Sequence, residues 1–379
     1  MEGGVAVALM KWDGAGASTF AVARAGLPDD DAPQDEWARA IGAAAGAPPT
    51  GVVLLADPAF EGVEALLRGL DFALPGVPVI GGMASAAGVG EGRALFSWQR
   101  GGGAGEGDEY RACTTSGAVG LVLSGDVSIQ PLVARGCRPL SKRTLTVTES
   151  RRHVVASVLD EESGIEAPPL EFLKAVMLNM GEDEQGEVSR NLMVGVCKDR
   201  FRSTASLSGA DFLARGVLGG NAAGALSVAD HVPVGTRVRF MARDRRGAEL
   251  AMAEQGRRYR VAELQALVGA GGAGGRGAAL GTLMFTCCGR GTRLFGRPHA
   301  DSEALRGVTG VPGVGLFCDG EIGPVAGSPA LLGLTCSAGV LRAGKPAGAG
   351  AAPGLSGLQR RIQALDMKLG DEPDGRAAD

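Results

Sequence analysis

Short apolar runs alternate with a helical pattern in the N-terminal part of the chain. Residues 51–56 form an unbroken apolar run, which is typical of a strand buried on both faces, and residues 75–80 predict another short strand. Between them, residues 61–70 carry apolar side chains at the spacing of one helix face. Residues 5–10 and 20–25 are shorter apolar segments, and we expect two further strands there.

The middle of the chain predicts further strands and one helix. Residues 117–124 and 127–134 are apolar runs on either side of a Gly-Asp turn, and this combination predicts a hairpin. Residues 236–243 alternate between apolar and arginine positions, as expected for an antiparallel strand with one face in water. Residues 168–180 predict a helix with proline in its first turn, and the acidic residues 181–187 predict a loop.

Two predicted strands in the last third of the chain lead into charged glycine turns. Residues 280–287 and 313–318 are apolar, and each is followed by a glycine-rich turn, the first with Arg290 and the second with Glu321. This arrangement presents polar groups at the ends of buried strands. Residues 330–341 predict the last strand of the sheet.

The C-terminal segment has a different pattern. Residues 344–354 are rich in Gly, Ala and Pro, which indicates a flexible linker. Apolar residues follow over 355–369, alternately three and four positions apart, and predict an amphipathic helix. Such a helix either docks on its own domain or binds a partner, and the pattern alone does not choose between the two.

Composition narrows the classes of function. The chain has 379 residues, of which 45% are hydrophobic, so we expect more than one sizeable core. A net charge of −4 and an aromatic content of 4% argue against a nucleic-acid binder. No apolar run approaches the roughly 18 residues of a membrane span. Scattered cysteines indicate reduced thiols, so we expect a cytoplasmic protein, or a plastid one if a transit peptide has been removed.

Sequence motifs for catalysis and for cofactors are missing. The three histidines lack His-x-x-x-His spacing, and there is no Cys-x-x-Cys pair, so no metal site is predicted. There is no Gly-x-Ser-x-Gly nucleophile turn, and the glycine run at 269–277 lacks the Lys-Ser/Thr of a phosphate-binding loop. We therefore expect no catalytic residue, no cofactor and no enzymatic activity.

Arg290 and Glu321 are the leading candidates for a ligand site. A guanidinium can hold a carboxylate and a carboxylate can hold an ammonium group, so the two together suit a zwitterion such as an amino acid. Alternatively, Arg290 pairs with Glu321 or with Asp301 and only locks two turns together. The neighbouring Cys287 and Cys288 point to opposite faces of a strand, so we expect one in the core and the other toward the pocket. The predicted ligand-binding residues are Arg290, Glu321, Cys288, Gly289, Gly291, Asp301, Gly320 and Arg243.

Several short segments together resemble one known family. They include Leu218-Gly219-Gly220-Asn221, Arg243-Asp244, Cys288-Gly289-Arg290-Gly291 and Gly320-Glu321-Ile322-Gly323-Pro324, with weaker matches at 52–56, 78–82 and 133–139. In order and spacing they resemble the paired FIST N and FIST C domains of bacterial signalling proteins. The stretch after Pro324 departs from the family, because residues 329–333 lack the histidine that relatives often carry there.

The resemblance implies a domain plan and a function. We expect an α+β protein with two related halves, each a mainly antiparallel or mixed β-sheet with helices packed on the outside. Residues 1–198 would be a FIST N-like domain, 199–343 a FIST C-like domain, and 344–379 the linker and amphipathic helix. The expected function is a non-enzymatic sensor of small ligands, such as amino acids, that acts on a protein partner. The alternative is a scaffold that keeps the fold without a ligand and docks a partner complex.

Overall fold

The computed structural model describes residues 7–43, 47–85, 94–99, 109–113, 116–197, 204, 207, 211–269 and 277–344. All of them belong to one compact unit that spans Met1–Lys345. The linker and helix predicted for 344–379 lie, apart from Gly344, outside the described residues.

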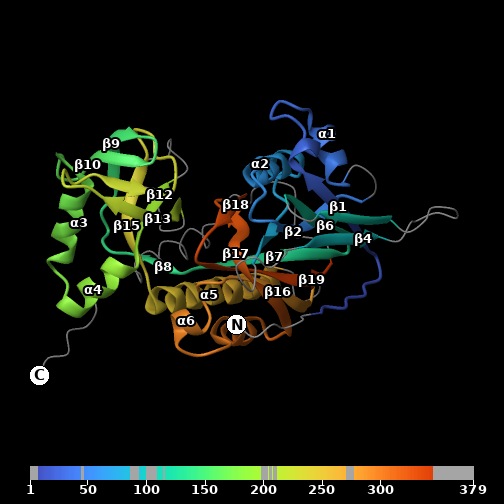
Figure 1. The fold of residues 1–379 in the computed structure, drawn as a ribbon. Helices are drawn as coiled ribbons and strands as arrows, with labels where there is room; N and C mark the ends of the chain where they lie inside the picture. Colours follow the sequence, from blue (N-terminus) through green and yellow to red (C-terminus); the bar gives the residue numbers. More distant parts are fainter. Residues whose placement is uncertain are drawn as a thin grey trace, which may run out of the picture. The chain divides into compact units, whose positions relative to one another are not determined.

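A mixed sheet of nine strands is the larger of the two main β structures (Figure 1). Its strands follow the order β1-β6-β2-β3-β17-β16-β19-β7, with β18 paired to β17. The pairs β2–β3 and β16–β17 are parallel, and the other pairs are antiparallel. The strands are β1 (Ala15–Ala23), β2 (Pro49–Ala56), β3 (Val79–Ala84), β6 (Gly117–Gly125), β7 (Val127–Arg135), β16 (Ala279–Cys287), β17 (Gly313–Val325), β18 (Ser328–Leu332) and β19 (Thr335–Ala343).

A closed antiparallel barrel of six strands is the second β structure. Each strand pairs with two neighbours in the cycle β10-β14-β13-β12-β15-β9. The six are β9 (Leu145–Arg151), β10 (Val154–Asp160), β12 (Leu192–Cys197), β13 (Phe212–Gly220), β14 (Leu226–Val228) and β15 (Arg237–Arg243). Short strands β8 (Cys137–Pro139) and β11 (Ile165–Ala167) extend it, while β4 (Leu95–Gln99) and β5 (Glu109–Cys113) form a separate ribbon.

Both β structures combine strands from distant parts of the chain. The nine-stranded sheet joins the early strands β1–β3, β6 and β7 to the late strands β16–β19. The barrel joins β9, β10 and β12 to β13–β15, which lie beyond residue 198. The predicted α+β class is confirmed. The strands do not divide into one sheet for 1–198 and another for 199–343, and the domain boundaries stay a prediction.

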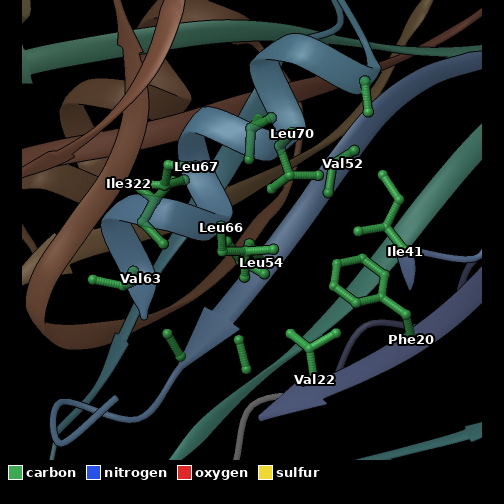
Figure 2. Packing of buried hydrophobic residues seen from close by; sticks show 14 of the residues in the cluster. Phe20, Val22, Ile41, Val52, Leu54, Val63, Leu66, Leu67, Leu70 and Ile322 are labelled. Atoms are coloured by element: carbon green, nitrogen blue, oxygen red, sulfur yellow. The ribbon is translucent and has the colours of Figure 1, made fainter. Parts of the chain in front are cut away.

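Helices cover the faces of the nine-stranded sheet and flank the barrel. Leu66 and Leu70 of α2 pack against Val52 and Leu54 of β2 in one buried core (Figure 2). On the sheet's β7–β19 part, α5 and α7 bury apolar side chains against the strands. The helices are α1 (Gln34–Ala40), α2 (Val63–Ala73), α3 (Pro169–Met177), α4 (Glu182–Arg190), α5 (Arg245–Gly269), α6 (Thr292–Phe295) and α7 (Ala300–Thr309), with a 3-10 turn at Arg24–Gly26.

The hairpin predicted at residues 117–134 is wrong. Strands β6 and β7 do follow one another across Gly125 and Asp126, but they do not pair. Strand β6 lies between β1 and β2, whereas β7 pairs with β19 from Thr335↔Arg135 to Ala343↔Val127. The Gly-Asp turn therefore joins two strands of the same sheet that are not neighbours. Each of them pairs with strands from other parts of the chain.

Three further predictions need correction. Residues 330–341 are not one strand, because the chain turns between β18 and β19 at Gly333 and Leu334. The acidic segment 181–187 is not a loop but most of α4, where Glu182, Asp183 and Glu184 fill the first turn and suit the helix dipole. The described part of 5–10 forms no strand.

Candidate functional site

Arg290 and Asp301 form a buried ion pair. Arg290 follows β16, is 2% exposed, and donates from Nε to Asp301 Oδ2 at 2.7 Å and from Nη2 to Asp301 Oδ1 at 2.6 Å. Its Nη1 donates to the Leu334 carbonyl at 3.4 Å, and the Phe295 ring centre lies 5.3 Å from its central carbon. The Thr286 hydroxyl also donates to Asp301 Oδ2, at 2.9 Å. Each guanidinium nitrogen of Arg290 is therefore engaged.

The ion pair keeps Arg290 charged in the interior. Burial by itself would lower the pKa of Arg290, but the hydrogen bonds and charge of Asp301 outweigh burial and raise that pKa above its ordinary value. Asp301 lies in the first turn of α7, where a carboxylate is favoured by the helix dipole. Of the alternatives open from the sequence, the structure has Arg290 paired with Asp301.

Glu321 is buried apart from this pair. It is fully buried within β17, opposite Gly82 of β3 and Leu332 of β18, so its predicted place in a turn is wrong. Its Oε2 accepts the backbone N–H of Thr335 at 2.9 Å, and among the described atoms Oε1 has no hydrogen-bond partner. Burial raises the pKa of Glu321 to about 8, against the opposing effects of the Thr335 N–H and the Arg290 charge.

Arg243, Cys288 and Gly289 meet at the turn after β16, whereas Gly320 lies within β17. Arg243 of β15 donates from Nη2 to the Gly289 carbonyl at 3.0 Å, which links the barrel to this turn. Cys287 is buried, as predicted for one of the two cysteines, whereas Cys288 is half-buried and lines neither of the two cavities described below. The Cys288 thiol donates to Asp319 Oδ1 at 3.2 Å, and burial, followed by that contact, raises the pKa of Cys288 to about 12.

Two adjoining cavities lie beside α7, and we call them together the α7 groove. Their volumes are about 220 and 580 Å³, and they share four lining residues, Met284, His299, Ser302 and Gly315. Of the predicted ligand-binding residues, Gly291 and Asp301 line the smaller cavity, whereas Arg290 and Glu321 line neither. Further lining residues of the smaller cavity include Thr286, Thr292, Pro298, Leu316 and Phe317.

Sequence reasoning missed most of this groove. Residues 313–318 were expected to be buried, yet Leu316 and Phe317 are 39% and 41% exposed. Asp301, which the sequence also allowed as a helix-start residue, lies in the first turn of α7, and Gly310 stands at the C-cap of that helix. Among the described residues, no group of three His, Cys, Asp or Glu could hold a metal ion. Within the same ranges, no helix has the length and apolar character to cross a membrane.

Comparisons with known proteins identify two matching domains. Residues 1–161 match the FIST N domain, and residues 169–324 match the FIST C domain. An uncharacterized protein of Mycobacterium tuberculosis, Rv0628c, is 34% identical over 287 residues, which cover 75% of this chain and 66% of that protein. An uncharacterized protein of Mycobacterium bovis, Mb0898c, is 32% identical over the same shares. The chain thus spans just under two thirds of the length of these relatives.

Proposed function

The chain belongs to the family that joins a FIST N to a FIST C domain, and we propose that it is a non-enzymatic sensor that binds a small molecule in the α7 groove. FIST domains are regarded as sensory domains without a known ligand. The observation that carries the proposal is the groove itself, which lies directly against the buried Arg290–Asp301 pair through Asp301.

The lining of the groove suits a small molecule with an apolar part and a hydrogen-bonding part. Leu316 and Phe317, which both line the smaller cavity, have exposed large apolar side chains, and exposed apolar surface beside a cavity commonly marks a binding site. Thr292, His299 and Ser302 are polar residues among those that line the same cavity. The smaller cavity, at about 220 Å³, has the size for a metabolite, and the larger one leaves room for an extension.

Because the guanidinium of Arg290 is already hydrogen-bonded, we place the proposed ligand in the groove and not between Arg290 and Glu321. Each nitrogen of Arg290 already donates a hydrogen bond, so a ligand carboxylate would have to displace Asp301 or Leu334. A ligand in the groove reaches Asp301 instead, without breaking the pair. Amino acids and small organic acids stay the first compounds to test.

A thermal-shift screen of the full chain tests the proposal. A ligand present at about 100 times its dissociation constant adds about 2.7 kcal/mol to the free energy of unfolding, which is readily visible as a higher melting temperature. The screen uses free amino acids and small organic acids, each over a concentration series. A concentration-dependent stabiliser supports a binding site, and the absence of any stabiliser in such a library counts against the sensor.

Two variants place the site. Thr292→Trp puts a large ring into the smaller cavity and should abolish stabilisation by the compound. Phe72→Ala is the control, because Phe72 is an exposed aromatic residue of α2 outside the groove. Stabilisation that survives in Thr292→Trp would place the ligand elsewhere.

A further inference from the structure

The chain passes between the nine-stranded sheet and the barrel at two neighbouring points. At the first, β7 ends in the sheet at Arg135 and β8 begins in the barrel at Cys137, so Gly136 is the only residue between them. At the second, Asp244 alone separates β15 of the barrel from α5, which packs on the sheet. Arg138 of β8 donates from Nε to Asp244 Oδ2 at 2.5 Å, so an ion pair ties the two crossings together.

Leu334, in the turn between β18 and β19, lies close to Gly136 at the first crossing. A methyl group on Gly136 would lie 2.3 Å from the Leu334 carbonyl oxygen and 3.0 Å from Arg290 Nη1, so only glycine fits there without a shift. Leu334 itself has φ 57°, in the left-handed region that leucine rarely adopts. Such strained residues persist only where the surroundings hold them.

Side chains of the candidate site hold this strained turn from both sides. Arg290 donates to the Leu334 carbonyl, and the Glu321 carboxyl accepts the N–H of the next residue, Thr335. The same guanidinium is fixed by its two bonds to Asp301, and this geometry tolerates little change in angle or distance. A movement of Asp301 must therefore be followed by Arg290, and through it by the Leu334 carbonyl.

We propose that Arg290 connects the α7 groove to the Gly136 crossing, so that occupancy of the groove changes how firmly the barrel strands at the crossing are held. The path runs from Asp301 on the groove wall through Arg290 to Leu334, which contacts Gly136. A second contact at the same place, from Arg243 to the Gly289 carbonyl, ties β15 to the turn that carries Arg290. The ligand step rests on the proposed sensor function, whereas the link from Asp301 to Gly136 exists without a ligand.

Hydrogen–deuterium exchange of the full chain without ligand tests this link. Asp301→Asn keeps the shape of the side chain but removes the charge that fixes Arg290. We expect about tenfold faster amide exchange in peptides covering residues 136–139, in addition to any change within α7. Thr286→Val is the matched control, because it removes the third hydrogen bond to Asp301 and leaves both bonds from Arg290 in place. Faster exchange confined to α7 and β16 would overturn the proposal.

A second pair of variants covers the case in which Asp301→Asn does not fold. Leu334→Gly should fold, because glycine adopts a positive φ without strain, and it should change the exchange rate at residues 136–139. Ala326→Gly is its control, since Ala326 also has a positive φ, of 52°, but lies in the β17–β18 turn. Equal exchange at 136–139 in the two glycine variants would refute the link. A failed ligand screen would leave these results standing, so the two proposals fail separately.

Discussion

The guanidinium of Arg290 and the carboxylate of Asp301 are joined by two hydrogen bonds, of 2.7 and 2.6 Å, with both side chains buried. Asp301 belongs to α7 and Arg290 to the turn after β16, so the pair fastens a helix to the end of a strand. From the sequence, Arg290 could either bind a ligand or hold two turns together. Arg290 holds α7 against the end of β16, and the groove beside Asp301 is where we propose that a ligand binds.

Loss of one partner of this pair should be costly. In Arg290→Met the Asp301 carboxylate stays buried without its counter-ion, and breaking a buried pair in this way costs about 3–5 kcal/mol. The double variant Arg290→Met/Asp301→Leu should be more stable than Arg290→Met, because it leaves no buried charge. Urea unfolding measures both. A double variant no more stable than Arg290→Met would show that the charge is not what matters.

The buried carboxyl of Glu321 should make stability depend on pH. Burial raises its folded-state pKa to about 8, above the unfolded value of about 4.3, so the folded chain binds more protons between these two values. The contribution of this group to stability therefore falls as pH rises from about 4.3 to 8, by at most about 1.4 kcal/mol per pH unit, and is constant outside that window.

Glu321→Gln removes this titration while keeping the acceptor for the Thr335 N–H. The free energy of unfolding of Glu321→Gln relative to wild type should increase from pH 5 to pH 8. Denaturation curves at both pH values measure it. Parallel pH profiles for the two proteins would mean that Glu321 does not change its protonation over this range.

Two glycine-to-alanine changes should act in opposite directions. Gly136→Ala places a methyl group 2.3 Å from the Leu334 carbonyl oxygen, and overpacking of this kind costs about 1–3 kcal/mol. Gly307→Ala lies in α7 with nothing within 4 Å of the added carbon, and alanine is favoured in a helix by about 0.5–1 kcal/mol. Thermal unfolding should show a lower melting temperature for Gly136→Ala and a higher one for Gly307→Ala than for the wild type. A neutral Gly136→Ala would argue against close contact at the crossing.

Thiol reactivity should report on Asp319. Burial, with the Asp319 carboxylate beside it, raises the pKa of the half-buried Cys288 to about 12, so little thiolate is present at neutral pH. Asp319→Asn should lower that pKa and speed alkylation of Cys288 by iodoacetamide, followed by mass spectrometry. Cys336 is the internal control, because its side chain is buried. An unchanged rate at Cys288 would show that Asp319 does not contribute to the raised pKa.

The sequence predicts local features well where one segment decides them. The unbroken apolar run at 51–56 became β2, and the helical spacing at 61–70 became α2, because each pattern matches the burial of its own element. Pairing was different. Nothing near Gly125 indicates that β7 will pair with β19, since the choice depends on which distant strand completes the sheet.

The glycines on either side of Glu321 predict a turn that the structure does not have. Gly320 and Gly323 suggest a turn, but both lie within β17, where neighbouring side chains lie close to the position that a Cβ would take. A methyl group on Gly323 would lie 2.7 Å from the Ser337 hydroxyl oxygen, and one on Gly320 would lie 3.0 Å from the Met83 sulfur. Close packing, rather than a change of chain direction, explains these glycines.

The central claim is that a small molecule binds in the α7 groove, and a paired melting-temperature measurement tests it most directly. The full chain and Thr292→Trp are heated side by side with increasing concentrations of each free amino acid or small organic acid. We expect at least one compound to raise the melting temperature of the wild type and of Phe72→Ala, and to leave Thr292→Trp unchanged. No stabilising compound, or equal stabilisation of Thr292→Trp, would contradict the claim.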